Sequence, residues 1–574
     1  MAFGTDLYLL TIGILIAFVG TIASFALARK SVSHAIRESN LMRRHILWLA
    51  VALLVFFVVE GFVVQPAQQL FFDDAIYQGG AQSMLNSGQA WMCDFGSPAQ
   101  CFVGEIFHEP IGTSFNLAIA FLVAGVKLAA TYNTMFVLGG VSVLFTFLAV
   151  AVLFRNPKVA FLSALMLALS PMVLIWARPT TSDIPTLAYS MVALFAMAVF
   201  IRRKSVFTLS AFAFSLALVS YMKVFALIYI PIILVMYLIL DDKSVRGSIR
   251  ENLRLLRKHA LDTNVLIVLL LFVVAIAPEI SYAYTQATTG NYGGAGTSLQ
   301  NTCAGNTLVP VAQNIGLSNL ADNICSSTLF WFDYYAGAQV VQPLLYTGLA
   351  VAGAACMFVF RFRRELLAIG LWFLAFFIFY ASFYAGSPTY GVDWRFQLSM
   401  AAQASILAGF ALFIIFDALS TALLAVAKKA KFTAAVSGIV VFLLIAYPVY
   451  AYLPVVGVSP AGINQAPDAR FYEGFVYNYS SMIPANCLVY TYDPTLFNIN
   501  NRSAEQMGDL FNSQVYENRS TQYSCAVLDW GYWCYTPNNY CAYAKQNYVL
   551  QPIKNATFQP GDKLFGFYRI VGRK

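Results

Sequence analysis

The stretch Phe71-Phe72-Asp73-Asp74-Ala75-Ile76-Tyr77 follows the second long apolar run of the chain. Two adjacent carboxylates here open the first large polar loop, just beyond the end of an expected membrane span. Ionisable groups at the edge of a membrane are costly unless they are paired or functional. The stretch therefore predicts chemistry at a boundary between membrane and water.

The composition is that of a membrane protein. The chain has 574 residues, of which 59% are hydrophobic and 11% charged, and its mean hydropathy is +0.67. Soluble domains carry about 25% charged residues. Apolar runs of about 20 residues cross the hydrocarbon layer as helices. We predict an all-α polytopic protein with about 12 full spans plus a short broken hairpin, the spans being 7–28, 46–64, 113–131, 133–154, 183–201, 205–222, 224–240, 263–281, 341–360, 366–384, 395–416 and 433–453.

The distribution of basic residues predicts the topology. The net charge of +8 comes from short basic clusters between spans, which mark the inner face and give no nucleic-acid signal. This assignment leaves three long regions outside, 65–112, 282–340 and 454–574. It also requires 159–180 to be a hairpin of two short limbs, broken at Ser170-Pro171, which puts Arg178 and Asp183 on the outer side. One ordinary span followed by a mislocated basic cluster is the alternative.

Cysteines and glycosylation motifs support the same orientation. Eight of the nine cysteines fall in the three outer regions in even numbers, which predicts disulfides in an oxidising compartment. The C-terminal region also carries four Asn-x-Ser/Thr motifs. We predict a membrane domain over 1–453 and a small extracytoplasmic α/β domain over 454–574. Strands are expected at 487–492, 526–530 and 564–571, and a helix near 504–510.

Ionisable and polar residues on the outer side form the candidate site. No phosphate-binding loop or large inner domain is evident, so an activated substrate should arrive through the membrane. Acidic residues there could act as a base or bind a metal, and basic residues could hold an anionic lipid head group. The candidates are Asp73, Asp74, Tyr77, His108, Glu109, Arg178, Asp183, Lys223, Asp393 and Arg395.

Several of these residues also have structural interpretations. Asp74 is suited to capping a loop helix, and Lys223 to reaching the interface with its long stem. Asp393 and Arg395 are close enough in sequence to neutralise each other. Arg178 is equally suited to anchoring a helix at the interface, and His108 to a structural role.

In order and spacing, these motifs resemble the membrane-embedded glycosyltransferases of the C superfamily. The closest likeness is to the branch of dolichyl-phosphate-mannose protein mannosyltransferases and bacterial aminoarabinose transferases. That family opens its first outer loop with Asp-Glu-x-x-Tyr, where this chain has an Asp in place of the Glu. The likeness covers roughly 45–415, with its further motifs at His108-Glu109-Pro110, Asp183–Leu187, Lys223 with Pro231, and Arg395-Phe396.

The resemblance implies transfer of a sugar from a polyprenyl (dolichyl) phosphate to an acceptor hydroxyl on the outer face. Asp73 would be the base and the anomeric centre would invert. Lys223 and Arg395 would hold the leaving phosphate. Glu109 and Asp183 would position the acceptor or bind a divalent ion, the one possible cofactor. The acceptor could be a protein, a glycan or a lipid.

Three other functions are compatible with parts of the sequence. An oligosaccharyltransferase of the same superfamily is one, since Asp529-Trp530-Gly531-Tyr532-Trp533 contains the residue types of that family's acceptor motif in scrambled order. A transporter would place acids at mid-membrane and have matching halves, whereas here the acids cluster at the outer edge and the halves do not match. A receptor or structural surface protein would leave Asp73, Lys223 and Arg395 without a joint purpose.

Overall fold

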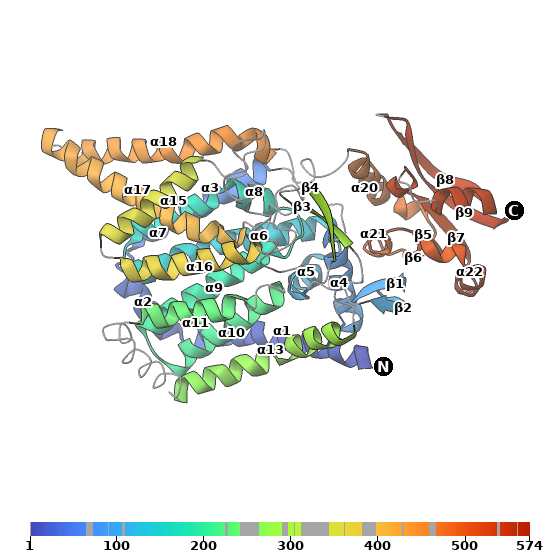
Figure 1. Ribbon diagram of the computed structural model, residues 1–574, viewed down its shortest axis with the longest axis horizontal. Coiled ribbons are helices and arrows are strands. Elements are labelled where there is room, and N and C mark those ends of the chain that lie inside the picture. Colours follow the sequence, from blue (N-terminus) through green and yellow to red (C-terminus); the bar gives the residue numbers. More distant parts are fainter. Residues whose placement is uncertain are drawn as a thin grey trace.

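The computed structural model is a long helical bundle with a sheet-containing C-terminal region at one end (Figure 1). It describes residues 2–64, 73–89, 91–105, 110–223, 228–241, 263–289, 297–302, 305–310, 344–360, 362–381, 398–427, 430–457, 467–535, 540–559 and 561–574. The helices of the bundle are α1 (Ala2–Leu27), α2 (Arg29–Glu38), α3 (Arg43–Phe62), α4 (Asp73–Ser87), α5 (Gly112–Ala124), α6 (Leu128–Phe154), α7 (Pro157–Ala168), α8 (Pro171–Trp176), α9 (Asp183–Arg202), α10 (Val206–Met222), α11 (Tyr229–Leu240), α13 (Thr263–Thr289), α15 (Leu344–Val359), α16 (Arg363–Ala381), α17 (Leu398–Ala427) and α18 (Ala430–Gly457).

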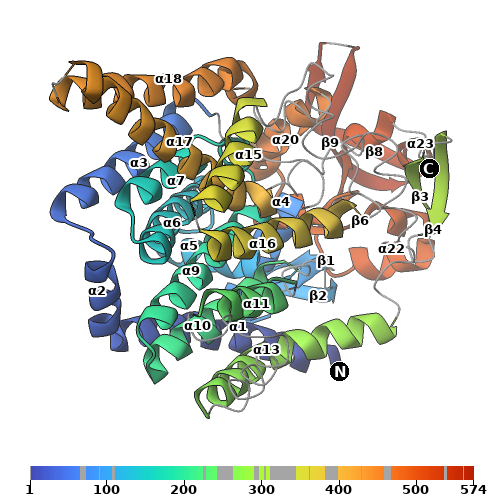
Figure 2. The same ribbon diagram turned by 60° about the vertical axis from the view of Figure 1, so that its left-hand side comes forward.

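The bundle has the composition of a membrane domain. Five of its described helices are long and apolar enough to cross a membrane, and seven shorter apolar helices accompany them. The chain is therefore a membrane protein of largely helical fold, whereas the predicted number of about 12 full spans is not confirmed. Helix α9 lies inside the bundle and packs against α6 and α10 (Figure 2). Nearly all of its side chains are buried, so polar residues on it face protein rather than lipid.

The predicted span 113–131 does not exist as one helix. Helix α5 ends at Gly125, whose φ of +81° lies in the left-handed region, and only glycine adopts such angles at little cost. The next helix, α6, begins at the end of the bundle where α4 lies. Its Tyr132 is close enough to Glu473 of the C-terminal region and Asp74 on α4 to interact with their charges. With only 13 residues, α5 is too short to cross the membrane and joins α4 to α6 at that end of the bundle.

The predicted hairpin at 159–180 is also wrong. The break at Ser170-Pro171 is present, between α7 and α8, and Arg178, just after α8, contacts Glu60 near the C-terminal end of α3. Arg202 donates to the Leu153 carbonyl at 2.9 Å, which places the last turns of α6 and α9 at one end. Together α7 and α8 therefore cross the bundle once. Because α5 does not cross, the three crossings made by α6, by α7 with α8, and by α9 bring Arg202 to the face that the basic residues predict. No hairpin is needed for this.

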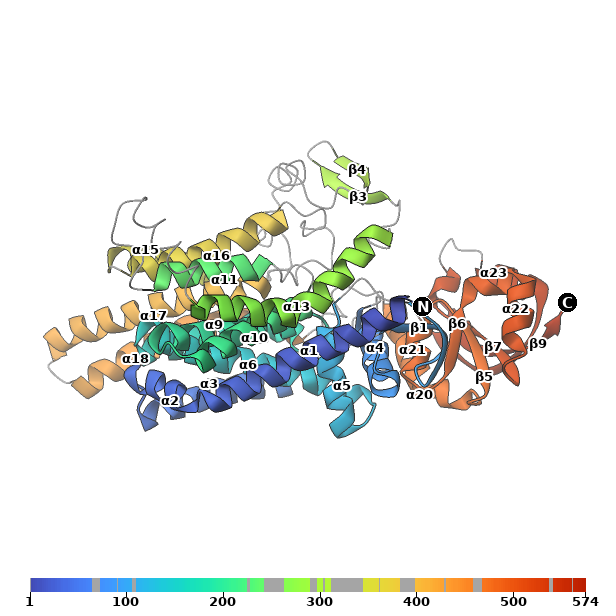
Figure 3. The same cartoon turned by 90° about the horizontal axis from the view of Figure 1, so that it is seen from below.

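The C-terminal region is built on a seven-stranded sheet of order β2-β1-β6-β5-β7-β9-β8. Two of its strands come from the first outer loop, so that a hairpin of that loop extends the C-terminal sheet (Figure 3). The pair β5–β6 and the pair β5–β7 are parallel. The elements are β1 (Met92–Ser97), β2 (Gln100–Glu105), β5 (Cys487–Thr491), β6 (Ser503–Gln506), β7 (Cys525–Trp530), β8 (Tyr548–Phe558), β9 (Lys563–Arg573), α20 (Pro467–Tyr479), α21 (Pro494–Asn498), α22 (Ser513–Ser520) and α23 (Tyr540–Asn547), with short 3-10 turns at Ser480–Met482, Met507–Phe511 and Tyr532–Tyr535.

The strands predicted near 487–492, 526–530 and 564–571 are confirmed as β5, β7 and β9. The helix expected near 504–510 is wrong, because Ala504 and Glu505 pair with β1 and β5 as strand β6, and only a 3-10 turn follows. Disulfides are present within the regions predicted to lie outside, at Cys93–Cys101, Cys487–Cys525 and Cys534–Cys541. Of the outer region 282–340, the structure describes the end of α13 and one hairpin, β3 (Thr297–Thr302) with β4 (Gly305–Pro310).

Candidate functional site

The acidic stretch of the first outer loop begins helix α4. Asp73 is its first residue, and its side chain lies outside the part that the structure describes. Asp74 and Tyr77 are buried, with 1% and 2% of their surface exposed. The helix lies at the end of the bundle that meets the C-terminal region (Figure 1). A carboxylate buried at such a position needs protein partners, so Asp74 belongs to the interior, and its role as a helix cap or a site residue stays a prediction.

The first turns of α5 connect α4 to the ends of α9 and α10. A Cβ on Gly80 of α4 would lie 2.8 Å from the Ser114 hydroxyl, so the two helices touch there. Two residues further along α5, Asn116 accepts a hydrogen bond from the Tyr189 hydroxyl of α9 at 2.7 Å. Its amide nitrogen lies 3.5 Å from the sulfur of Met222, the last residue of α10. Through these contacts, helix α4, the first turns of α9 and the end of α10 all pack around the polar first turns of α5.

Asp183 and Lys223 form a buried ion pair. Asp183 begins α9, Lys223 directly follows α10, and the lysine ammonium donates to Oδ1 of the aspartate. The two residues are 3% and 5% exposed. The sequence predicted each as a site residue but did not predict that they pair. A lysine this deeply buried does not reach the interface as a lone cation, so the structure rejects that interpretation of Lys223.

Arg178 is paired in the interior as well. Its Nε lies 3.3 Å from a carboxylate oxygen of Glu60 on α3, and its guanidinium also donates to the Glu60 carbonyl at 2.5 Å. The guanidinium carbon lies 4.7 Å from the centre of the Phe136 ring on α6. Arg178 is therefore not an exposed interfacial anchor: it joins the linker after α8 to α3 and α6. Both partners are buried, and two charged groups persist in such a place only when paired.

Sequence reasoning missed two acidic residues. Glu60 lies inside the apolar run of α3, and Glu279 follows Pro278 inside α13; both are buried. The sequence could have indicated both, because an ionisable residue within an apolar span is costly unless another group pairs with it. For Glu60 that partner is Arg178, in a segment 118 residues away.

The C-terminal region is fastened to the acidic loop. Strand β1 pairs with β6 through Phe95 and Gly96. Asn498 of α21 donates to the Cys93 carbonyl at 2.9 Å, beside the Cys93–Cys101 disulfide. Gln82 of α4 donates to the Asn501 side chain at 2.7 Å. The helix that carries the two aspartates is thus held from the membrane side by α5 and from the other side by the C-terminal region.

Four predicted site residues lie outside the described residues: His108, Glu109, Asp393 and Arg395. Their roles stay predictions. Within the described part of the chain, no three His, Cys, Asp or Glu side chains gather as a metal site would require. Glu109 is outside that part, so a divalent ion held there stays a prediction too.

A family comparison and a fold comparison agree with the motifs. Residues 108–282 match the family model described as dolichyl-phosphate-mannose-protein mannosyltransferase, a segment that includes Arg178, Asp183 and Lys223. A search of curated proteins gives no match.

Among solved structures, the fold is similar to that of ArnT from Cupriavidus metallidurans bound to undecaprenyl phosphate. The identity is 15% and the TM-score 0.52, with 92% of this chain and 98% of that one covered. The apo state of the same protein matches at 14% identity and a TM-score of 0.53, covering 92% and 97%. The oligosaccharyltransferase AglB from Archaeoglobus fulgidus, in complex with an inhibitory peptide and a dolichol-phosphate, matches at 14% identity and a TM-score of 0.50, covering 92% and 74%. The predicted resemblance to membrane glycosyltransferases of the C superfamily is confirmed.

Proposed function

We propose that this protein is a membrane glycosyltransferase that moves a sugar from a polyprenyl phosphate to an acceptor hydroxyl. The observation that carries the proposal is the buried Asp183–Lys223 pair, which lies inside the segment matched by the mannosyltransferase family. A lipid-linked donor suits a chain whose candidate residues lie at one end of a helical bundle. The fold neighbours that bind undecaprenyl phosphate and a dolichol-phosphate support this donor class.

In the proposed reaction the acceptor oxygen attacks the anomeric carbon as the bond from that carbon to the phosphate oxygen breaks. Asp73 takes the proton of the acceptor hydroxyl. The bonding electrons leave with the polyprenyl phosphate, which is stable as an anion and needs no acid. Attack opposite the leaving group inverts the anomeric centre.

Lys223 and Arg395 are proposed to stabilise the leaving phosphate. The ion pair gives Asp183 a defined part in this: it holds the lysine ammonium at a fixed point and offsets the cost of burying its charge. Lys223 would attract the phosphate through its positive charge, which the Asp183 carboxylate holds in place.

The site is proposed to face the extracytoplasmic side. The described disulfides all lie in the C-terminal region or in the loop hairpin that joins it, and disulfides persist in oxidising compartments. The basic residues Arg43, Arg44 and Arg202 lie at helix ends away from that region, as expected of an inner face. The protein is then a multi-pass protein of the cell membrane.

The sequence support for the oligosaccharyltransferase alternative is weakened. In the stretch Asp529-Trp530-Gly531-Tyr532-Trp533, which carries the likeness to an acceptor motif, Asp529 and Trp533 are buried and Trp530 is half-buried. Buried residues are not available to an acceptor peptide.

The test is release of polyprenyl phosphate from radiolabelled donors by the purified protein in lipid. Wild type is compared with Asp73→Asn, which keeps the size and removes the base, and with Asp74→Asn as the matched neighbour. Release by wild type and Asp74→Asn but not by folded Asp73→Asn supports the proposal. Loss only in Asp74→Asn moves the base by one residue. No release by wild type from any polyprenyl-phosphate monosaccharide refutes the donor class.

A further inference from the structure

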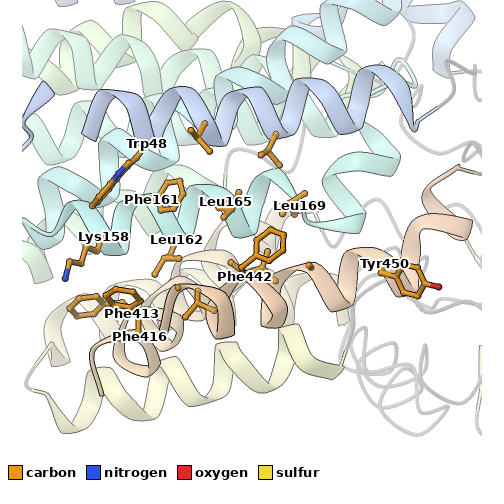
Figure 4. A pocket seen from close by; sticks show the side chains of 16 residues that line it. Trp48, Lys158, Phe161, Leu162, Leu165, Leu169, Phe413, Phe416, Phe442 and Tyr450 are labelled. Carbon is orange, nitrogen blue, oxygen red and sulfur yellow. The ribbon is translucent and has the colours of Figure 1, made fainter. Parts of the chain in front are cut away.

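An apolar groove of about 750 Å³ runs along α7, between α3 and α18 and beside α17 (Figure 4). Ligand pockets in proteins measure about 300–1,000 Å³. Among its lining residues only Lys158 is charged. In Figure 4, Lys158 and Trp48 lie at one end of the groove and Tyr450 lies toward the other. The groove thus runs along the helices that line it, is apolar over its length and is basic at one end.

The groove is recessed into the bundle and open on one side. The floor of the groove is formed by Leu162 of α7, Leu169 directly after α7 and Val441 of α18, each less than a tenth exposed. Phe442 and Tyr450, on the same helix α18, are 65% and 79% exposed and form its rim. A flat lipid-facing surface would expose all of these side chains alike, so this shape fits a chain-like occupant that enters from the lipid.

The charges at the groove's end favour an anionic head group. Lys158 lies in the first turn of α7, its Nζ 5.2 Å from the centre of the Phe416 ring. Helix α3 begins nearby with Arg43 and Arg44, two turns or less from the lining residue Trp48. Helix α18 begins at this end with the exposed Lys431. The acidic residue on the neighbouring helix, Asp417, is exposed and does not line the groove.

We propose that this groove binds one anionic phospholipid of the leaflet opposite the C-terminal region, its phosphate beside Lys158 and an acyl chain along α7. From Gly438 to Tyr450 helix α18 rises about 18 Å along the groove, more than half of a hydrocarbon layer of about 30 Å. One acyl chain therefore fits along its length. The phosphate position is at the end of the bundle away from Asp183 and Lys223, so this lipid is distinct from the proposed sugar donor.

Two variants separate lipid binding from folding. Lys158→Met keeps the apolar stem and removes the charge, with Lys127→Met, an exposed lysine before α6 at the other end, as its control. Gly438 lines the groove, and a Cβ added there meets no atom within 4 Å. Gly438→Phe therefore fills the groove, while a helix interior gains stability when glycine is replaced.

The experiment is native mass spectrometry and thermal unfolding of the full chain in detergent, titrated with phosphatidylglycerol, phosphatidylcholine or polyprenyl phosphate. We expect one tightly retained phosphatidylglycerol that raises the melting temperature. Lys158→Met should bind it about fivefold more weakly, the worth of one basic residue near an anionic lipid, and Lys127→Met should bind it unchanged. Gly438→Phe should fold and retain none.

Three results would overturn the proposal. Equal retention of phosphatidylcholine and phosphatidylglycerol by wild type would mean that the groove holds bulk lipid only. Unchanged retention by folded Gly438→Phe would place the lipid elsewhere. Preference for polyprenyl phosphate over phosphatidylglycerol, lost in Gly438→Phe, would assign the groove to the donor's chain.

Discussion

The membrane bundle and the C-terminal region both bury an aspartate, and they stabilise it in opposite ways. In the bundle, Asp183 accepts from the ammonium of Lys223. In the C-terminal region, Asp529 accepts from two hydroxyls, that of Tyr472 at 2.5 Å and that of Thr491 at 2.8 Å. Burial is the dominant influence on Asp529 and raises its pKa to about 8, so this carboxyl is protonated at neutral pH.

The neutral Asp529 and the charged Asp183–Lys223 pair differ in what they cost the fold. A neutral carboxyl bonded to hydroxyls completes a core and needs no counter-charge. A buried ion pair is costly, and replacing it with apolar residues of the same volume is often neutral or stabilising. The proposed site keeps such a charged pair in the interior, and the proposal that this pair serves the reaction can be tested against the neutral Asp529. The predictions below test this distinction, from the largest expected effect on transfer to the smallest.

The largest effect is expected for Lys223→Met. Loss of the cation proposed for the leaving phosphate should lower turnover by about 10²–10³-fold, the usual cost of removing such a group. The single variant also leaves Asp183 unpaired in the interior, which destabilises by about 3–5 kcal/mol. The measurement is donor turnover together with the melting temperature in lipid.

The matched double variant Lys223→Met with Asp183→Asn separates the two losses. Removing both charges should restore most of the stability while turnover stays low. If the double variant regains turnover as well, the pair is structural and Lys223 has no part in phosphate binding.

A smaller effect on transfer is expected at the Glu60–Arg178 pair. It joins three elements of the bundle, so Arg178→Met should destabilise by about 3–5 kcal/mol through the unpaired Glu60. The double variant Arg178→Met with Glu60→Gln should recover stability and keep turnover within about tenfold of wild type. A stable double variant without turnover would show that Arg178 contacts a substrate, as the sequence predicts.

The contrast between the regions also explains what the sequence could predict. The bundle, the break at Pro171, the outer disulfides and the strands β5, β7 and β9 follow from composition and local pattern. The course of α5 does not, because its apolar run is long enough for a span and only the left-handed Gly125 and the neighbouring Lys127 reveal the turn.

The sequence also could not predict which residues far apart in the chain pair with each other. Glu60 and Arg178 are 118 residues apart in sequence and Asp183 and Lys223 are 40 apart, and no local period relates them. The pairing of β1 with β6 joins strands about 400 residues apart. The sequence predicted Arg178, Asp183 and Lys223 as single residues, and only packing shows which charges meet.

The link between the two regions should have a moderate effect. Asn498→Ala removes the hydrogen bond to the Cys93 carbonyl, worth about 1 kcal/mol. If the C-terminal region positions α4, turnover should fall several-fold while the melting temperature changes little. Asn500→Ala is the control, since Asn500 donates to Leu496 within its own segment. Equal turnover in both variants would show that the hydrogen bond does not position the acidic helix.

The smallest effect on transfer is expected for Asp529→Asn, whose signature is in the pH dependence of stability. The folded pKa of about 8 lies above the ordinary 3.8 of an aspartate, so between these values the folded state binds a proton that the unfolded state has lost. Stability from this group is therefore complete below about pH 4 and falls as the pH rises to about 8.

An asparagine oxygen can accept from the same two hydroxyls without titrating. The difference in melting temperature between Asp529→Asn and wild type should therefore shift in favour of the variant from pH 5 to pH 9. Asp493, whose pKa burial also raises, is present in both proteins and contributes to both curves. A constant difference across this range would mean that Asp529 is ionised in the fold, and the two regions would then bury charge by the same means.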